Sequence, residues 1–315
     1  MTMLFPGFVK RRISTSGTEI SLIIGGSGPP VLLLHGYPQS HAMWHKIGPR
    51  LAQHFTVVCP DLRGYGDSGK PVSDPDHSTY SKRAMAQDQV EVMHALGFER
   101  FALVGHDRGA RVAHRLARDH VEQVERLVVL DISPTAIMYG KTDKAFATAY
   151  YHWFFLIQPY DLPERLIAAD PGYYLRKKLG GFGVSGLGIF DTRALAEYER
   201  CFRDPATIHA TCEDYRAAAT IDLEHDAADM GRKIDCPLLV LWGEKGVVHR
   251  FFDPIEDWKS VASDVRGKAL PCGHFLAEEA PEETYAEVVG FLRDSPEQRR
   301  YGASGRSGKI ARLAK

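Results

Sequence analysis

The residues VGHDRGAR, from Val104 to Arg111, decide the fold predicted for the rest of the chain. They follow a short apolar run, FAL, and lead into VAHRLARDH, in which apolar residues recur at helical spacing. The stretch is therefore expected to be a strand that turns sharply into a helix. Gly105 and Gly109 would let the two elements pack closely, and Asp107 stands at the centre of the turn.

Similar apolar runs lie on both sides of this stretch, separated by helical patterns. They are continuous rather than alternating, as in strands that are buried on both faces of a parallel sheet. The runs are PPVLLLHG (29–36), FTVVCPDLRG (55–64), RFALVGHD (100–107), VERLVVLDI (124–132), CPLLVLWG (236–243) and KALPCGH (268–274). Their alternation with helices predicts right-handed βαβ units and an α/β fold. FVKRRISTSGTEISLIIGG (8–26) is expected to form an antiparallel hairpin at one edge.

The alternation stops after Asp131 and resumes at CPLLVLWG. Residues 135–232 contain aromatic, proline-rich and helical stretches without a convincing parallel strand, so they are expected to form an inserted helical cap. The cap would separate two parts of one core, residues 1–134 and 233–294. The final stretch, 295–315, is rich in glycine, serine and basic residues and is expected to be a disordered tail.

The bulk properties narrow the class of protein. The chain has 315 residues and a formal net charge of -1, which favours neither nucleic acid nor an anionic membrane as a partner. Its five cysteines are scattered and form no CxxC pair, as expected for a reducing compartment. No stretch approaches the roughly 20 apolar residues of a membrane span, and the first residues do not resemble a signal peptide. A soluble, cytoplasmic protein is therefore expected.

A strand that enters a helix through G-x-x-x-G is typical of the nucleophile elbow in the α/β-hydrolase fold, where the central residue is usually serine. That fold is a mostly parallel sheet with helices on both faces. An aspartate at this place, with an ordinary pKa of about 3.9, is ionised at neutral pH. It can attack an sp³ carbon that carries a good leaving group and form an ester. The alternative is that Asp107 only caps the following helix.

Hydrolysis of such an ester needs a histidine that activates water and an acid that orients the histidine. His274, after the last predicted strand, fits the chain order of this fold; the alternative is a structural histidine. The acid usually follows CPLLVLWG, but Gly246 occupies the expected position and Glu244 lies too close to the strand end. Asp131, at the end of the preceding strand, is therefore assigned as the acid rather than as a turn cap. Cys272 is expected to be structural.

The first core strand ends in HGYPQS, which resembles an oxyanion-hole loop of this fold. The backbone N–H groups of Tyr37 and Arg108 are expected to bind the oxyanion that forms when water attacks the ester. Arg108 and Arg111 share a helix face with Asp107, and two guanidinium groups exceed what one aspartate needs. They predict a small anionic substrate, with a carboxylate favoured. A structural salt bridge to another acid is the alternative.

YYHWFF, in the predicted cap, places His152 beside Trp153. Imidazole, indole and phenol donors can solvate a halide ion that has lost its water, although most aromatic clusters simply belong to a core. The sequence as a whole resembles the haloacetate dehalogenases, which include the fluoroacetate dehalogenases. The motifs that carry the resemblance, in order, are HGYPQSHAMWH, DLRGYGDS, GHDRGAR, VLDISPT, YHWFF, CEDYRAAA, DLEHD and GHF.

The resemblance covers nearly the whole chain apart from the basic tail. It implies that Asp107 displaces halide from the α-carbon of a haloacetate and that water activated by His274 releases glycolate. It also implies a homodimer without a metal or organic cofactor. Tyr37 departs from the pattern, because phenylalanine is expected there. The implied roles are nucleophile, Asp107; base, His274; acid, Asp131; carboxylate binding, Arg108 and Arg111; halide binding, His152, Trp153 and Tyr215.

Two other functions stay open at this point. Epoxide hydrolases and haloalkane dehalogenases also use an aspartate at the elbow, and Tyr215 could donate a proton to an epoxide oxygen. Arg108, where those enzymes typically carry tryptophan, argues against an uncharged substrate. A non-catalytic binding protein of the same fold is the other alternative, although such proteins often lack a member of the catalytic triad.

Overall fold

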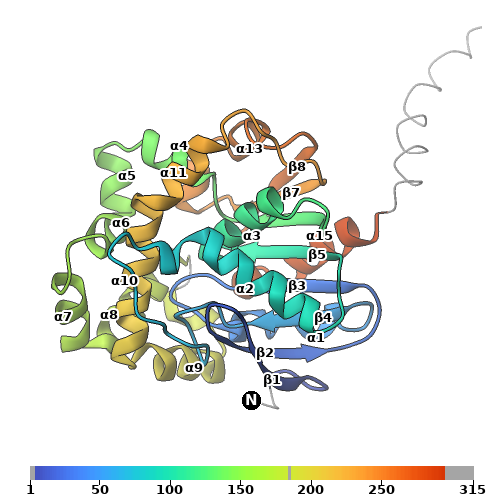
Figure 1. The fold of residues 1–315 in the computed structure, drawn as a ribbon, viewed down its shortest axis with the longest axis horizontal. Helices are drawn as coiled ribbons and strands as arrows, with labels where there is room; N and C mark the ends of the chain where they lie inside the picture. Colours follow the sequence, from blue (N-terminus) through green and yellow to red (C-terminus); the bar gives the residue numbers. More distant parts are fainter. Residues whose placement is uncertain (1–3, 184–185, 295–315) are drawn as a thin grey trace, which may run out of the picture.

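The structure is a computed structural model that describes residues 4–183 and 186–294; the predicted tail, 295–315, lies outside the described residues. Eight strands form one sheet in the order β1-β2-β4-β3-β5-β6-β7-β8 (Figure 1). The strands are β1 (Val9–Ser14), β2 (Glu19–Gly25), β3 (Pro30–Leu34), β4 (Thr56–Pro60), β5 (Phe101–His106), β6 (Val124–Leu130), β7 (Leu238–Gly243) and β8 (Val265–Leu270).

The pairing of the strands confirms the predicted α/β sheet. The six strands from β4 to β8 in the sheet order run parallel, whereas β1 and β2 form the antiparallel hairpin at one edge. The central strands are continuous apolar runs because helices cover both faces. The two edge strands instead carry exposed basic residues, among them Arg11 on β1 and Lys268 on β8, which discourage edge-to-edge association.

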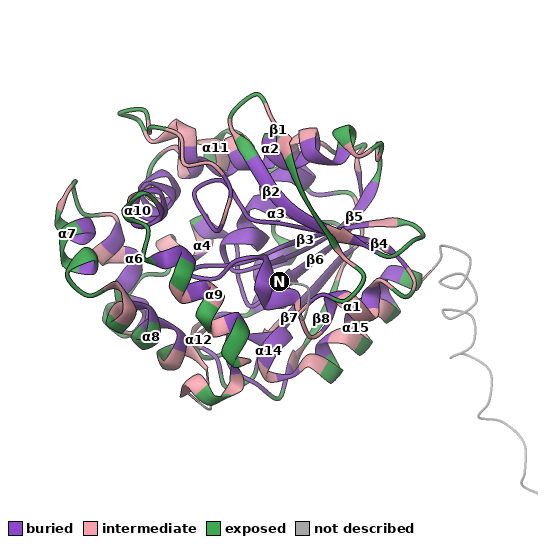
Figure 2. Ribbon diagram, turned by 90° about the horizontal axis from the view of Figure 1, so that it is seen from below, coloured by how far each residue is buried: buried purple, intermediate pink, exposed green. Residues whose placement is uncertain are grey.

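Helices cover both faces of the sheet. Figure 2 shows α2 and α3 on one face and α1 and α15 on the other, with buried strands between them. The helices outside the insertion are α1 (Gly48–Leu51), α2 (Lys82–Ala95), α3 (Arg108–Asp119), α12 (Val247–Phe251), α13 (Pro254–Lys259), α14 (Leu276–Glu279) and α15 (Pro281–Arg293). None of the helices within 4–183 and 186–294 has the length and apolar character needed to cross a bilayer.

The segment between β6 and β7 is helical, and no strand occurs in its described parts, 135–183 and 186–232. Most of its helices gather on the left in Figure 1, beyond one end of the sheet. The inserted helices are α4 (Thr135–Gly140), α5 (Lys144–Ala149), α6 (Tyr151–Leu156), α7 (Leu162–Ala169), α8 (Pro171–Phe182), α9 (Thr192–Phe202), α10 (Pro205–Ala219) and α11 (Ile221–Ala228).

The inserted helices meet the sheet at the end where β5 runs into α3. The backbone N–H of His274 donates to the carbonyl oxygen of Phe182, the last residue of α8 (3.3 Å). The hydroxyl of Tyr37, in the loop after β3, donates to the hydroxyl of Tyr174 on α8 (3.3 Å). The loops at this end of the sheet are therefore enclosed between the core and the inserted helices.

Candidate active site

Asp107 lies in a sharp turn that its neighbours enforce. Its φ of 48° and ψ of -115° are unusual for a residue with a side chain. A Cβ atom at Gly105 would lie 2.6 Å from Cα of Ala110, and one at Gly109 would lie 2.4 Å from the carbonyl oxygen of His35. Strand and helix can approach this closely only because both positions are glycine. The turn therefore holds Asp107 at the junction of β5 and α3.

The Asp107 side chain faces the loop after β3 instead of capping α3. Its Oδ1 accepts a hydrogen bond from the backbone N–H of Tyr37 (2.9 Å). Within the described chain it makes no capping hydrogen bond to its own helix. The interpretation of Asp107 as a simple helix cap is therefore wrong.

The structure brings His274 and Asp131 to the same place. His274 Nδ1 lies 2.6 Å from Asp131 Oδ2, and His274 Nε2 lies 3.9 Å from Asp107 Oδ2. The other oxygen of Asp131, Oδ1, accepts a hydrogen bond from the backbone N–H of Gly243 (3.0 Å). Asp131 thus fixes the ring of His274, and the opposite ring nitrogen faces Asp107.

The position of Gly246 is consistent with the prediction that the acid comes from the end of β6. A Cβ atom at Gly246 would lie 3.4 Å and 3.6 Å from the two carboxylate oxygens of Asp131. A carboxylate at either position would therefore occupy the same space next to the histidine. Glu244 is exposed, and Cys272 is buried, which raises the pKa of its thiol.

Charges around Asp107 and His274 favour the ionised forms. Burial alone would raise the pKa of Asp107, but His274, His106, Arg111 and Arg108 together lower it below its ordinary value. Burial alone would lower the pKa of His274, but its hydrogen bond to Asp131 and the charges of Asp131 and Asp107 raise it. Asp107 is therefore a carboxylate at neutral pH, which is the form that can attack carbon.

The two arginines differ in their partners. The Nε and Nη2 groups of Arg108 donate to the carboxylate of Asp214 (2.9 and 2.6 Å). Most of this guanidinium therefore belongs to a buried salt bridge, the alternative that the sequence left open, and Nη1 is the part that remains. Arg111 instead donates to Thr135 Oγ1 (2.7 Å) and to Met138 Sδ (3.2 Å), and it forms no ion pair with any residue in 4–183 or 186–294. Arg111 is thus a buried cation without an ion pair among these residues; burial and Arg108 lower its pKa, and the nearby Asp107 carboxylate offsets this only in part.

Several buried polar atoms around Asp107 have no hydrogen-bond partner among the described residues. The rings of His152 and Tyr215 have centroids 5.7 Å apart, and those of Trp153 and Tyr215 are 6.5 Å apart. The guanidinium of Arg108 lies 4.1 Å from the Tyr215 ring centroid, and that of Arg111 lies 4.7 Å from the Trp153 ring. The unpartnered atoms are Arg108 Nη1, Arg111 Nε, His152 Nδ1, Trp153 Nε1 and the Tyr215 hydroxyl.

Such a set is costly unless a ligand completes it, because a buried donor without a partner loses its hydrogen bonds to water. Burial and the nearby cations lower the pKa of His152 well below its ordinary value, so its ring is neutral. Burial raises the pKa of Tyr215, so its hydroxyl keeps its proton. The donors and the two guanidinium groups together suit a small anion.

Sequence reasoning missed Asp214 and two residues of α8 that enclose the site. Lys178 is buried, its ammonium lies 4.5 Å from the ring centroid of Phe182, and burial lowers its pKa to about 7. The Phe182 ring lies 5.1 Å from His152 and 5.7 Å from His274, between centroids. Lys178 and Phe182 lie in none of the motifs, because their place at the site depends on how α8 packs. Tyr37 lies 5.2 Å from the Tyr215 ring, so the departure from phenylalanine falls beside the predicted halide donors.

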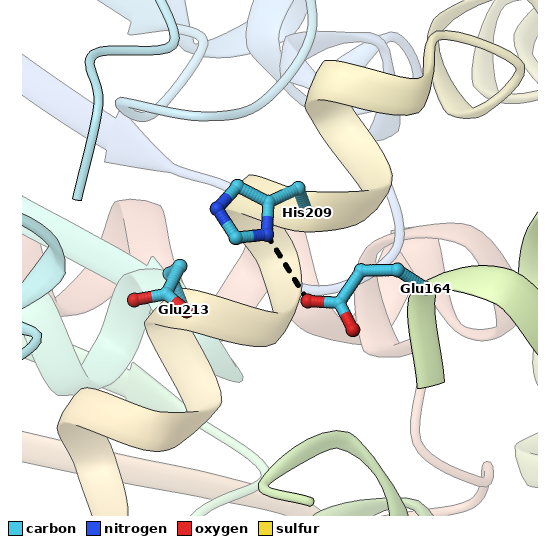
Figure 3. Close-up of side chains that lie close together, drawn as sticks. All are labelled: Glu164, His209 and Glu213. Carbon is cyan, nitrogen blue, oxygen red and sulfur yellow. Dashed lines mark hydrogen bonds and ion pairs between the residues drawn. The ribbon is translucent and has the colours of Figure 1, made fainter. Parts of the chain in front are cut away.

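One cluster of possible metal ligands occurs among the described residues, outside this site. Figure 3 shows Glu164, His209 and Glu213 close together, on α7 and α10. The guanidinium Nη1 of Arg216 lies 2.7 Å from Glu164 Oε1 and 2.6 Å from Glu213 Oε1. Arg216 therefore already supplies the positive charge that the two carboxylates require, and the cluster gives no argument for a metal ion.

Comparison with known proteins places the chain in a family. The family model described as the α/β-hydrolase fold matches residues 29–281. A fluoroacetate dehalogenase from Burkholderia sp. is 48% identical over 292 residues, which cover 93% of this chain and 96% of that protein. A soluble epoxide hydrolase from Corynebacterium sp. is 36% identical over 280 residues, which cover 88% of this chain and 94% of that protein.

A solved structure agrees. A crystal structure described as that of an α/β hydrolase from Nostoc sp. PCC 7120 superposes with a TM-score of 0.90 at 62% identity, covering 91% of this chain and 99% of that chain. The fold, the elbow and the extent of the matches lead to one assignment. The chain is a hydrolase of the α/β-hydrolase superfamily and belongs to the family of the fluoroacetate dehalogenases.

Proposed function

We propose that this hydrolase converts a haloacetate, such as fluoroacetate or chloroacetate, into glycolate and halide. The observation that carries the proposal is the set of unpartnered buried donors and the unpaired cation of Arg111 beside the Asp107 carboxylate. A haloacetate presents two features that need such groups: a carboxylate, and a halogen that leaves as an anion. The 48% identity to a fluoroacetate dehalogenase supports the same reaction.

The first step forms an ester. Arg111 and Nη1 of Arg108 bind the substrate carboxylate, since guanidinium groups suit carboxylates in geometry and charge. Asp107 Oδ2 attacks the α-carbon in line with the carbon–halogen bond, and the bonding electrons leave with the halide. Donors on His152, Trp153 and Tyr215 hydrogen-bond the halide in place of water. Lys178 adds positive potential at the site.

The second step hydrolyses the ester and restores Asp107. His274 Nε2 removes a proton from water, the resulting hydroxide attacks Cγ of Asp107, and the glycolate oxygen leaves with that proton. Asp107 is left as a carboxylic acid, and loss of its proton to solvent restores the carboxylate. Oδ1 is the oxygen that becomes negative, and the backbone N–H of Tyr37 already donates to it at 2.9 Å. The N–H of Arg108 is the second proposed donor of this oxyanion hole. Asp131 keeps His274 in the tautomer that the step requires.

Formation of the ester also shifts His274 toward its neutral form, which is the form that can accept a proton. The negative charge of Asp107 is one of the causes that raise the pKa of His274. Forming the ester removes that charge, so the pKa of His274 falls when the histidine must accept a proton. The two steps are thereby coupled through a single carboxylate.

Epoxide hydrolysis is the second candidate, because the 36% identical relative is an epoxide hydrolase and the Tyr215 hydroxyl is a buried donor without a partner among the described residues. An epoxide carries no negative charge, however, and would leave the Arg111 cation uncompensated in a buried site. The observations therefore favour the anionic substrate.

The test is halide release from fluoroacetate and chloroacetate by the purified protein, measured in parallel by ion chromatography, with styrene oxide as an epoxide control. Release of either halide, without diol formation from the epoxide, supports the proposal. Diol formation without halide release would show that the protein is an epoxide hydrolase. Failure with every substrate would favour a non-catalytic binding protein.

We also propose a domain organisation, a location and an oligomeric state for this enzyme. Residues 135–232 would act as a cap over a core made of residues 1–134 and 233–294. The protein would be a cytoplasmic homodimer. Its small-molecule ligand would be the haloacid substrate. Light scattering coupled to size-exclusion chromatography tests the dimer directly.

A further inference from the structure

A cavity separate from the candidate active site lies beside α3, the helix that carries Arg108 and Arg111. It has a volume of about 590 Å³ and is lined by residues of α3, α4 and α11; α4 and α11 lie side by side at the top of Figure 1, and α3 lies nearer the middle of the view. Small-molecule sites typically have volumes of about 300–1,000 Å³. The cavity is thus large enough for a ligand bigger than a haloacetate.

Helices α3 and α4 each present one face to the candidate active site and another to this cavity. On α3, Arg111 faces the active site, whereas His114 and Arg118 line the cavity. On α4, Thr135 and Met138 contact Arg111, whereas Ile137 and its neighbours line the cavity. The two sites are therefore separate but share the same helices.

The cavity has buried polar atoms that lack partners among the described residues. These atoms are His114 Nε2, Arg118 Nε and the Tyr139 hydroxyl. His114 is 5% exposed and Arg118 is 4% exposed, so neither is well solvated. Burial and the arginines nearby lower the pKa of His114 well below its ordinary value, so its ring is neutral. Unpartnered groups of this kind need a ligand that forms hydrogen bonds.

The charges at the cavity favour an anion. Arg118 forms no ion pair within 4–183 and 186–294, and its Nη2 donates to the carbonyl oxygen of Arg232 (3.0 Å). Asp226 is the acidic residue on the lining, and Arg115 Nη1 lies 3.9 Å from it. Burial raises the pKa of Asp226, whereas Arg115 and Arg118 lower it, so this one carboxylate is shared between two arginines.

The rest of the lining is apolar. Ile137, Leu223, Met230 and Val261 contribute to it, and Met230 is 83% exposed at the rim. An apolar group that covered these side chains would gain roughly 25 cal/mol for each Å² removed from water. We propose that the cavity between α3, α4 and α11 is a second binding site for a monocarboxylate with an apolar chain or ring, larger than a haloacetate.

Two methionines allow the cavity and the active site to be observed separately. Met230 lines the cavity, whereas Met138 is fully buried and contacts Arg111. The experiment is a titration of the full chain, labelled with carbon-13 at the methionine methyl groups, with hexanoate as the probe. Met230→Leu and Met138→Leu identify the two resonances. The expected result is a saturable shift of the Met230 resonance by hexanoate and a much weaker response to hexan-1-ol.

Arg118→Met should weaken the affinity read at Met230 about tenfold or more, which corresponds to about 1.4 kcal/mol at 25 °C. Lys144→Met removes an exposed lysine on α5 and is the matched control, which should leave the affinity unchanged. If Arg118→Met does not fold, Ala136→Trp tests the same site, because Ala136 is exposed on α4 and an indole there would fill the cavity. That variant should lose the Met230 response and keep any Met138 response.

Four results would overturn the proposal. Hexanoate could shift Met138 alone, which would leave the active site as the place where it binds. Hexan-1-ol could bind as well as hexanoate, or Arg118→Met could bind as well as the parent, which would exclude an anion site. A Met230 resonance that moves with protein concentration but not with hexanoate would show that a second copy covers the cavity. None of these readouts depends on haloacetate turnover, so the proposal stands or fails separately from the proposed function.

Discussion

The surroundings of Asp107, rather than its own chemistry, suit it to the proposed attack on carbon. An exposed aspartate is ionised but solvated by water, whereas Asp107 is 5% exposed and is kept ionised by His274 and the arginines. A carboxylate that is ionised without a full shell of water is a better nucleophile toward carbon. The same surroundings would bind the proposed substrate, because Arg111 forms no ion pair among the described residues and can pair with a substrate carboxylate.

Replacing His274 by asparagine should separate the two steps. The first step needs no base, so Asp107 should still form the ester, and hydrolysis should then stall. Intact-mass spectrometry after incubation with chloroacetate should detect a protein heavier by one carboxymethyl group. Asp107→Asn is the control and should remain unmodified. A His274→Asn protein that turns over normally without an adduct would show that another group activates water.

Arg111→Leu and Arg108→Leu should have different consequences because their partners differ. Loss of Arg111 should weaken haloacetate binding by about 3–5 kcal/mol, the usual cost of removing one member of a buried charge pair, with little change in the melting temperature. Loss of Arg108 leaves Asp214 without its bidentate partner and should lower the melting temperature as well. The measurements are KM and thermal unfolding. Equal losses of stability in both variants would contradict this assignment.

At the residue scale, position in the chain was enough to predict which residues meet. Asp107, Asp131 and His274 each follow the end of a parallel strand, and such ends meet at one edge of a sheet. Asp214 was not predicted as the partner of Arg108, although it lies in the CEDYRAAA motif, because it follows no strand and its place depends on the packing of α10. The sequence could show a surplus of positive charge but not which arginine would be neutralised.

At the scale of elements, the elbow depends on two glycines. The Cβ atom of an alanine at Gly109 would lie 2.4 Å from the backbone oxygens of Leu34, which ends β3, and of His35, which follows it. Gly109→Ala should therefore destabilise the fold by several kcal/mol, as over-packing of a core does at about 1–3 kcal/mol or more. Urea unfolding measures the loss.

Gly290→Ala is the matched control for this prediction. Gly290 lies in α15, and no described atom within 4 Å would meet a new Cβ. Alanine has the higher helix propensity, so this variant should gain about 0.5–1 kcal/mol. A Gly109→Ala protein as stable as Gly290→Ala would show that α3 does not need its close approach to the end of β3.

The core elements were predictable and the arrangement of the inserted helices was not. Continuous runs such as VLLL in β3 mark strands buried on both faces, so the sheet followed from the sequence. The insertion is divided into short helices: α5 ends at Ala149, and a new helix, α6, begins at Tyr151, within YYHWFF. Helical periodicity indicates that such segments are helical, but their packing depends on contacts that are distant in sequence. Lys178 and Phe182 on α8 were missed for this reason.

At the scale of the whole molecule, a buried ion network joins the insertion to the core. Asp214 on α10 binds Arg108 on α3, and it also accepts a hydrogen bond from Lys82 on α2. Burial alone would raise the pKa of Asp214, but Arg108 and Lys82 lower it well below its ordinary value. A carboxyl group with a lowered pKa in the folded state adds stability above its unfolded pKa of about 3.9, and this stability is lost as the pH falls below that value.

Asp214→Asn should therefore lower the free energy of unfolding by about 3–5 kcal/mol near neutral pH, since it leaves the buried Arg108 without its carboxylate and Lys82 with Asp222 alone. The difference from the parent protein should narrow as the pH falls below about 4. Urea unfolding at a series of pH values measures both effects. A difference that stays constant with pH would mean that the charge of Asp214 does not stabilise the fold.

The source of the oxygen atom in the product shows directly whether Asp107 is the nucleophile. A single turnover of chloroacetate, with protein in excess, is carried out in water enriched in oxygen-18, and the glycolate and the peptide that contains Asp107 are analysed by mass spectrometry. If Asp107 attacks carbon, the first glycolate carries the ordinary oxygen of the aspartate, and Asp107 takes up the heavy isotope. Glycolate labelled with oxygen-18 in the first turnover, with Asp107 unlabelled, would mean that water attacks the substrate directly and that Asp107 is not the nucleophile.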